Sequence, residues 1–229
     1  RDAAASLEMA TRLIVLQKEA LEGLTPKQRH KARVIHQSVT RSLVPVPPVR
    51  RFRLCVLGHL REEKDPFCAA RALRWVSDSH VEIIQAGKAL SAKMTHEAER
   101  RMRDDARYRW VGELPHWAAM RLLSRSHAMV ISSRMEGGAH VVSEAIAMGI
   151  PVIATDIPGN RGLLGTGYPA YFPVGDHTVL AALLRRALDD PRFLNCLAAA
   201  VRRRRPLVDP RREQRTWRGL LRELGFRPA

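Results

Sequence analysis

The sequence predicts an α/β fold built on a doubly wound parallel sheet. Between residues 52 and 188, short unbroken apolar runs alternate strictly with longer segments of helical periodicity. Strands of a parallel sheet are buried on both faces, so they read as continuous apolar runs. Ligands of such sheets bind beyond the carboxyl ends of the strands. We therefore expect a binding site at the turns that follow residues 57, 85, 111, 132 and 155.

The individual elements follow from this alternation. Short runs rich in valine, isoleucine and leucine predict strands at 12–17, 32–36, 52–57, 81–85, 108–111, 128–132, 151–155 and 170–172. Apolar residues at helical spacing predict helices at 18–24, 66–76, 92–103, 116–126, 139–148, 177–188, 193–203 and 211–224. Gly149 and Pro151 end one of these helices, and Asp176 caps the start of another.

A proline-rich stretch separates the first two strands from the rest of the chain. Residues 43–49 contain three prolines, which exclude helix and favour a stiff, extended linker. We therefore place a domain boundary at 41–50. The chain opens with Arg1 rather than Met, and residues 3–10 resemble the end of a helix, so we expect a segment to precede it.

The composition is that of a globular protein in a reducing compartment. Of the 229 residues, 45% are hydrophobic, which supports a sizeable core. No apolar run approaches the ~20 residues of a membrane span, and no signal peptide is visible. Cys55, Cys68 and Cys196 are scattered and lack metal-ligand spacing. We expect a cytoplasmic protein with no membrane span and no metal site, and the sequence contains no hydrolase motif.

Arginine dominates the end of the chain and much of the net charge of +16. Ten arginines lie between Arg202 and Arg227, a density that occurs in segments that bind nucleic acid or anionic membranes. The alternative is the solvated face of a helix. Aromatic residues make up only 5% of the chain and do not interleave with basic ones, so we expect no nucleic-acid partner.

The most informative stretch is residues 133–144. Glu136 and Glu144 flank the glycine pair Gly137–Gly138, after one predicted strand and at the start of a predicted helix. Glycines allow close approach of a ligand, and the free amides of a helix N-terminus attract phosphates. A carboxylate one turn into the helix can hold a ribose diol. A strand, a glycine turn and a helix also occur as a plain structural turn, but the two glutamates favour a nucleotide-sugar site.

A second candidate turn follows the strand at 52–57. Gly58 permits a tight exit from that strand, and His59, Arg61 and Lys64 follow before the predicted helix at 66–76. Cations ahead of a helix are unfavourable for its dipole, and an anionic ligand would remove that conflict. The alternative is a surface loop that contains a Glu63–Lys64 pair.

Two further turns complete the predicted site. Gly112 gives a flexible exit from the strand at 108–111, and Trp117 either stacks on a base or belongs to the core. Residues 159–162 form a predicted turn after the strand at 151–155, where backbone amides and Arg161, next to Asn160, could hold an anion.

The two glutamates and the glycines between them resemble the E-x7-E motif of GT-B glycosyltransferases of the family 4 type. The segments 58–64, 151–156 and 172–176 occur in that family's order, and the resemblance covers roughly residues 33–190. It implies two Rossmann-like domains with the nucleotide-sugar donor on the C-terminal one. Residues 1–40 then end a truncated N-terminal acceptor domain, 51–190 form the donor domain, and 191–229 cross back to the first domain.

Four longer strings, at 58–66, 109–117, 133–145 and 159–165, resemble the selenosugar synthases of selenoneine biosynthesis, a bacterial group in this superfamily. That resemblance implies transfer of the sugar from a UDP-sugar such as UDP-N-acetylglucosamine to selenophosphate, with formation of a carbon–selenium bond. His59 stands where the wider family has arginine, and 160–162 replace a usual glutamate. Both departures would suit an anionic acceptor.

The resemblance also implies roles for single residues. Glu144 would bind the ribose hydroxyls, Glu136 the donor sugar, and Lys64 with Arg61 or His59 would stabilise the charge that develops on UDP. The diphosphate would lie on the amides of Gly137, Gly138, Ala139 and His140, and Gly58 and Gly112 would line the donor site. Asn160 and Arg161 are candidates for the sugar or selenophosphate. No cofactor is implied. The alternatives are a family 4 enzyme with a hydroxyl acceptor and a basic nucleic-acid-binding module.

Overall fold

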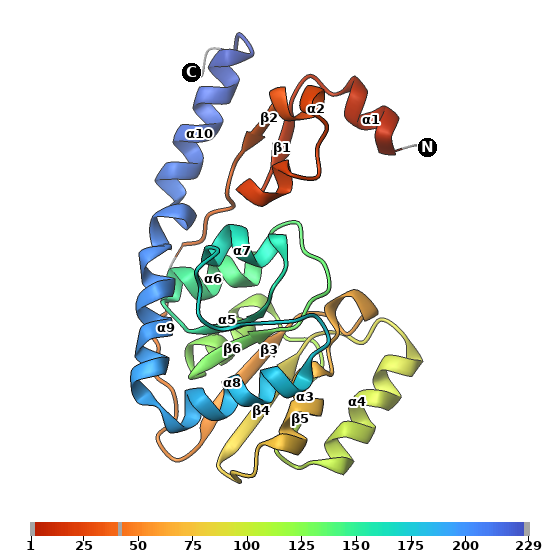
Figure 1. Cartoon of the computed structure of the whole chain (residues 1–229), viewed down its shortest axis with the longest axis vertical. Helices are drawn as coiled ribbons and strands as arrows, with labels where there is room; N and C mark the ends of the chain where they lie inside the picture. Colours follow the sequence, from red (N-terminus) through yellow and green to blue (C-terminus); the bar gives the residue numbers. More distant parts are fainter. Residues whose placement is uncertain (1–2, 41–42, 227–229) are drawn as a thin grey trace.

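A computed structural model describes residues 3–40 and 43–226 (Figure 1). Its main feature is a sheet of six parallel strands in the order β5-β4-β3-β6-β7-β8, and the predicted α/β fold class is confirmed. The strands are β3 (Phe52–Leu57), β4 (Val81–Ala86), β5 (Tyr108–Trp110), β6 (Ala128–Ile131), β7 (Val152–Thr155) and β8 (Tyr171–Phe172). All six coincide with predicted apolar runs. The predicted linker includes residues 41 and 42, which lie outside the described residues, as do residues 1, 2 and 227–229 of the outer predicted segments.

The strand order reverses in the middle of the sheet. β3 pairs with β4 on one side, with Leu54 opposite Ile83, and with β6 on the other, with Leu54 opposite Ala128. The next strand in sequence thus lies on one side of β3, and a strand some seventy residues later lies on the other. Such a switch point opens a crevice at the carboxyl ends of the two central strands.

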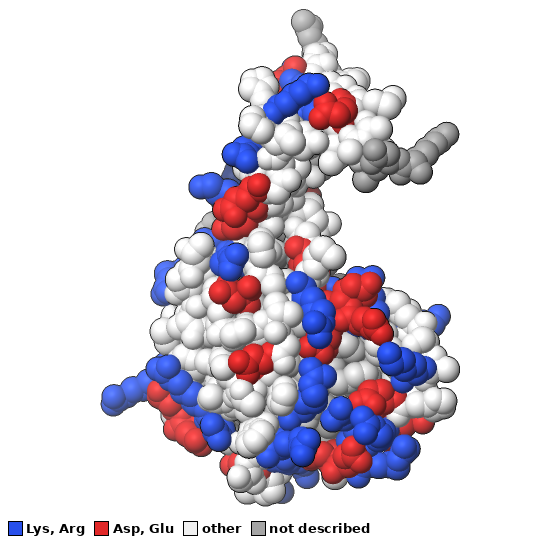
Figure 2. All heavy atoms as spheres, turned by 45° about the vertical axis from the view of Figure 1, so that its right-hand side comes forward, with Lys and Arg blue, Asp and Glu red and all other residues white. Residues whose placement is uncertain are grey.

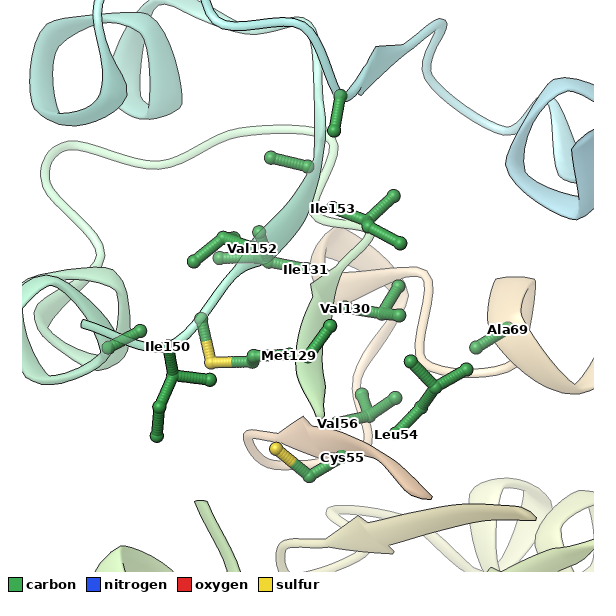
Figure 3. Close-up of a cluster of buried hydrophobic side chains, with 14 of the residues drawn as sticks. Leu54, Cys55, Val56, Ala69, Met129, Val130, Ile131, Ile150, Val152 and Ile153 are labelled. Carbon is green, nitrogen blue, oxygen red and sulfur yellow. The ribbon is translucent and has the colours of Figure 1, made fainter. Parts of the chain in front are cut away.

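Helices cover both faces of the sheet, so its side chains are buried on both sides. Figure 3 shows Leu54 and Val130 pointing towards Ala69 of α3, whereas Met129 points to the opposite face, towards Ile150. The helices around this sheet are α3 (Cys68–Ala72), α4 (Ala92–Asp104), α5 (His116–Ser124), α6 (His140–Met148), α7 (Pro158–Leu164), α8 (His177–Asp189), α9 (Pro191–Arg203) and α10 (Pro210–Glu223). Short 3-10 turns are η2 (Glu62–Lys64), η3 (Leu73–Trp75) and η4 (Arg205–Val208).

Two predictions of local structure were wrong. The predicted turn at 159–162 is helix α7, which begins with Pro158, ends at Leu164 and has Gly165 as its C-cap; the glycines at 159 and 162 hid its periodicity. The predicted helix at 66–76 is shorter than expected and consists of α3 followed by the 3-10 turn η3. It begins only after Pro66 and Phe67, which precede the first helical residue. The predicted cap is present, because the Asp176 carboxylate accepts the amides of Thr178 and Val179.

The first part of the chain forms a separate small sheet. It consists of α1 (Ala3–Met9), β1 (Leu13–Val15), η1 (Lys18–Leu21), α2 (Pro26–His30) and β2 (Ala32–Val34), with β1 and β2 parallel. Helix α2 was not predicted, although Thr25 and Gln28 form a capping box at its start. η1 packs against α7, and α10 runs alongside β1 and β2 (Figure 1). The division of the chain into domains stays a prediction.

Part of the arginine run completes the fold. Arg204 donates from Nε to the Leu163 carbonyl at 2.7 Å, and Arg205 donates to the Met148 carbonyl at 3.0 Å. These carbonyls end α7 and α6, where a cation also complements the helix dipole. On the face drawn in Figure 2, basic and acidic side chains are interspersed rather than gathered into one basic patch. In the described part of the chain, no helix is long and apolar enough to cross a membrane.

At Gly162, helix α7 comes close to the segment that follows β1. A Cβ there would lie 2.3 Å from Gln17 Oε1 and 2.6 Å from Gln17 Cβ, and Gln17 is buried. Alanine favours a helix by about 1 kcal/mol over glycine, but overpacking costs about 1–3 kcal/mol.

We therefore expect Gly162→Ala to lower the melting temperature of the protein and the hydrogen-exchange protection of β1. Gly167→Ala, with no atom within 4 Å, is the control; equal effects of the two would contradict this contact.

An acidic clasp joins the end of α10 to the first sheet. Arg33 and Arg12 donate to the Glu223 carboxylate, and these bonds hold the pKa of Glu223 below its ordinary value. The stabilisation is therefore present above the unfolded-state pKa and is lost as the pH falls through the folded-state pKa.

We expect Glu223→Gln to reduce amide protection in β1 and β2 at pH 7 and to remove the acid sensitivity of that protection. Glu97→Gln, which breaks ion pairs within α4 alone, should leave that protection unchanged.

Candidate functional site

A cleft of about 440 Å³ opens at the carboxyl ends of β3, β4 and β6. This position is the switch point of the sheet, where ligands of doubly wound sheets bind. Several predicted site residues line it: Gly58, His59, Arg61, Lys64, Glu136, Gly138, Ala139 and His140, together with Gly87, Glu113 and Leu114. The turns after four predicted strands therefore meet in one cleft.

Lys64 and Glu136 form an ion pair across the switch point. Lys64 Nζ donates to Glu136 Oε1, and Ser133 Oγ donates to the same oxygen at 2.6 Å. Lys64 ends the turn after β3, whereas Glu136 follows β6, so the pair exists because these two strands are neighbours. Both side chains are largely covered, so the cation and the carboxylate offset each other's desolvation.

A second layer of hydrogen bonds fixes the backbone that carries this pair. Ser132 Oγ donates to the carbonyls of Lys64 and Asp65, at 3.1 and 2.9 Å. Thr155 Oγ1, on β7, donates to the Ser133 carbonyl at 2.6 Å. The ends of β3, β6 and β7 are thereby tied together, which keeps the two charged groups on rigid elements.

The glycine turn brings other backbone close to the cleft. A Cβ on Gly138 would lie 2.7 Å from Leu16 Cβ, and a Cβ on Gly159 would lie 2.2 Å from the Glu136 carbonyl oxygen. Gly138 therefore lets the first sheet lie on the turn, and Gly159 lets α7 approach it from the other side. Helix α6 begins at His140, and Ala139, its N-cap, makes no side-chain cap bond. The first amides of α6 thus lack a capping side chain, which favours an anion there.

Glu144 lies one turn into α6 and is 4% exposed. His116 Nε2, at the start of α5, is 2.7 Å from Glu144 Oε1, and His140 Nε2 is 3.7 Å from the same oxygen. Two imidazoles therefore flank a buried carboxylate beside the cleft. An ionised carboxylate only accepts hydrogen bonds, so His116 donates from Nε2.

His59 and three glycines, at 58, 87 and 112, fix the backbone around the cleft. His59 Nδ1 accepts the Lys88 amide at 3.1 Å, which leaves Nε2 as the protonated nitrogen of the neutral ring. Gly112 has a φ of +73°, which favours glycine, and its carbonyl accepts the Gly87 amide at 2.7 Å. A Cβ on Gly87 would lie 1.9 Å from the Gly58 carbonyl oxygen, so the backbone after β4 touches that after β3.

The structure does not bring Asn160 and Arg161 into the cleft. Asn160 is fully buried and donates from Nδ2 to the carbonyl and hydroxyl oxygens of Thr155, at 2.9 and 3.1 Å. Arg161 pairs with Asp156 at 2.7 Å. Trp117 is exposed and does not belong to the core. Any role of these three side chains in binding stays a prediction.

Gly87, which lines the cleft, and the contact of His116 with Glu144 beside it were not predicted; Glu113, Leu114 and His116 belong to the turn at 112–117, which the sequence offered as a place for the base. A glycine directly after a predicted strand was a usable signal for Gly87, but nothing in the sequence pairs His116 with Glu144. Burial raises the pKa of Cys68, at the start of α3, to about 11, so its thiol is not a nucleophile at neutral pH. Within residues 3–40 and 43–226, no three His, Cys, Asp or Glu side chains are grouped to hold a metal ion.

Comparison with known proteins gives one family. Residues 45–204 match the family described as glycosyl transferases group 1. The chain is 30% identical over 154 residues to a glycogen synthase of Mycobacterium tuberculosis, which covers 66% of this chain and 37% of that protein. It is 30% identical over 107 residues to glycosyltransferase 1 domain-containing protein 1 of Xenopus tropicalis, covering 46% of this chain and 31% of that protein. The chain thus spans about a third of the length of these curated relatives.

Solved structures share the fold at low identity. Sucrose-phosphate synthase from Thermosynechococcus elongatus has a TM-score of 0.84 and 21% identity, over 96% of this chain and 60% of that one. The Anabaena protein HepE in complex with UDP and glucose has a TM-score of 0.78 and 16% identity, over 97% of this chain and 65% of that one. The architecture is that of a GT-B Rossmann-like domain, and the chain belongs to the glycosyl transferases group 1 family.

Proposed function

We propose that this chain carries the donor site of a glycosyltransferase that takes its sugar from UDP. One observation carries the proposal: a cation, an uncapped helix start and the Glu136 carboxylate lie around a single cleft at the switch point of a parallel sheet, and the Glu144 carboxylate lies beside it, near His140. Solved relatives of the same fold contain UDP with glucose or with GlcNAc. Family membership and these complexes support a UDP-sugar as the donor.

The parts of the donor match the parts of the cleft. The ribose hydroxyls would donate to Glu144, and the diphosphate would lie on the amides from Gly137 to His140. Lys64 bonds to Glu136 in the structure. With donor bound, Lys64 would turn to the β-phosphate, and Glu136 would accept from a sugar hydroxyl. Each charged group would thereby exchange one ionic or polar partner for another.

In the reaction, the bond between the anomeric carbon and the β-phosphate oxygen breaks, and its electron pair leaves with UDP. Lys64, with Arg61 or His59, would stabilise the negative charge that develops on that oxygen. These groups lie on the turn after β3, whose backbone is fixed by the Ser132 hydroxyl. A preorganised cation of this kind needs no rearrangement during bond cleavage, which is the physical basis of its effect on rate.

For the acceptor we propose selenophosphate, so that a carbon–selenium bond forms as the carbon–oxygen bond breaks. Support comes from the four long strings that resemble selenosugar synthases and from the cationic turn of His59, Arg61 and Lys64, which suits an anionic acceptor. Selenium is a good nucleophile at neutral pH, so the acceptor needs no strong general base. A hydroxyl acceptor, as in an ordinary family 4 enzyme, is the alternative.

UDP binding tests the donor site. Calorimetry of this chain without added metal should give a dissociation constant in the micromolar range. Glu144→Ala should abolish detectable binding, because the ribose hydroxyls lose their acceptor; Glu97→Gln, on α4, is the control. No UDP binding by a folded sample would contradict the proposal. Binding to DNA or RNA that falls steeply with salt and is indifferent to Glu136→Ala would favour the basic-module alternative.

Product analysis tests the acceptor. With UDP-N-acetylglucosamine and selenophosphate, mass spectrometry should detect UDP release together with a sugar that carries selenium. Lys64→Ala should lower the rate about 10²-fold, the usual effect of removing one such electrostatic group. Lys93→Ala, whose side chain pairs with Glu62 at the surface, should not. An oxygen glycoside formed from a hydroxyl acceptor, with no selenium product, would rule out selenophosphate.

A further inference from the structure

The His116 side chain lies over the carboxylate that the proposed function gives to the ribose. Its Nε2 is 2.7 Å from Glu144 Oε1, and the His116 side chain is 75% exposed whereas that of Glu144 is 6% exposed. The imidazole therefore reaches the carboxylate from the solvent side. This is also the side from which a nucleotide must arrive, because the rest of Glu144 is enclosed by helix α6 and its neighbours.

The fold itself does not require this contact. His116 is the first residue of α5, and the N-cap of that helix is Pro115, which makes no side-chain cap bond. Glu144 is held by the helix that carries it, where every residue from Val142 to Met148 is buried. An exposed histidine bonded to a buried carboxylate at the edge of a cleft thus adds little packing. The main consequence of the bond between His116 and Glu144 is that it limits which other groups can reach the Glu144 carboxylate.

A ribose and His116 would compete for the same oxygen. The carboxylate only accepts, and both the imidazole N–H and the ribose hydroxyls only need an acceptor. A diol that uses both carboxylate oxygens must displace or share the bond from His116. We infer that His116 is a further residue of the nucleotide site, a latch that occupies Glu144 Oε1 until the ribose replaces it. This inference rests on the proposed assignment of Glu144 to the ribose.

The bond from His116 is strong enough to compete with the ribose. A hydrogen bond to an ionised carboxylate is about twice as strong as one between two neutral groups. The groups around His116 are His140 and Glu144 on α6, Glu113 in the turn before α5, Arg121 on α5, and Glu213 on α10, which interacts with His140. A comparison with a variant that lacks only His116 separates its effect on nucleotide binding from the effects of these neighbours.

The test is UDP affinity by calorimetry for the native chain, His116→Ala and His96→Ala, an exposed histidine on α4 that serves as control. His116→Ala should bind UDP more tightly, by about two- to tenfold, the value of one competing hydrogen bond. That advantage should vanish for 2′,3′-dideoxy-UDP, which has no ribose hydroxyls to place on Glu144. Weaker binding in His116→Ala, or an equal gain for the dideoxy nucleotide, would overturn the latch.

A measurement without nucleotide keeps the two proposals separate. In histidine NMR spectra of the ligand-free chain, Glu144→Gln should shift the imidazole resonances of His116 and leave those of His96 in place. If UDP binds and these resonances do not move, the latch is wrong and the donor site stands. If the His116 resonances move but neither the native chain nor His116→Ala binds UDP, the contact between His116 and Glu144 exists but the donor assignment is wrong. The latch, which rests on that assignment, then fails as well.

Discussion

The pairing of β3 with β6 is the constraint on which the site depends. These strands lie far apart in sequence, and only their adjacency brings the turn that ends at Lys64 against the turn that contains Glu136. The bond from the Ser132 hydroxyl to the Lys64 carbonyl, and that from Thr155 to Ser133, then fix the ends of three strands to one another. A partly buried ion pair needs a rigid backbone, because a poorly positioned pair would not offset the free energy lost when its two charges are removed from water.

Close contacts at glycines determine how segments that share no sheet meet. The glycines at 138, 159 and 162 allow Leu16, the backbone of Glu136 and Gln17, respectively, to approach within distances that a Cβ would forbid. In the sequence, all three of these glycines lie in predicted turns. In the structure, they are contact points between segments that share no sheet, and the cleft lies directly beside them.

The elements that the sequence predicted well are those whose periodicity is strong and whose environment is local. β6, the glycine turn and α6 follow from an apolar run, two adjacent glycines and a helical repeat, so the sequence alone places Glu136 and Glu144 at the end of a strand and the start of a helix. Helix α7 could not be predicted, because its glycines erase the apolar repeat and its stability comes from contacts with Gln17 and Arg204. The burial of Asn160 and the contact of His116 with Glu144 are long-range facts, which depend on the positions of neighbouring helices rather than on residue spacing.

The order of synthesis has a consequence for the bonds that Arg204 and Arg205 make at the ends of α7 and α6. The six-stranded sheet is complete once residue 172 has been made, yet the carbonyls that end α6 and α7 receive Arg205 and Arg204 only some thirty residues later. The first sheet waits longer still, because its clasp to Glu223 comes from the last helix. During synthesis β1 and β2 therefore stay without the contact to Glu223 until α10 has been made, so these segments must find each other after the central sheet has formed.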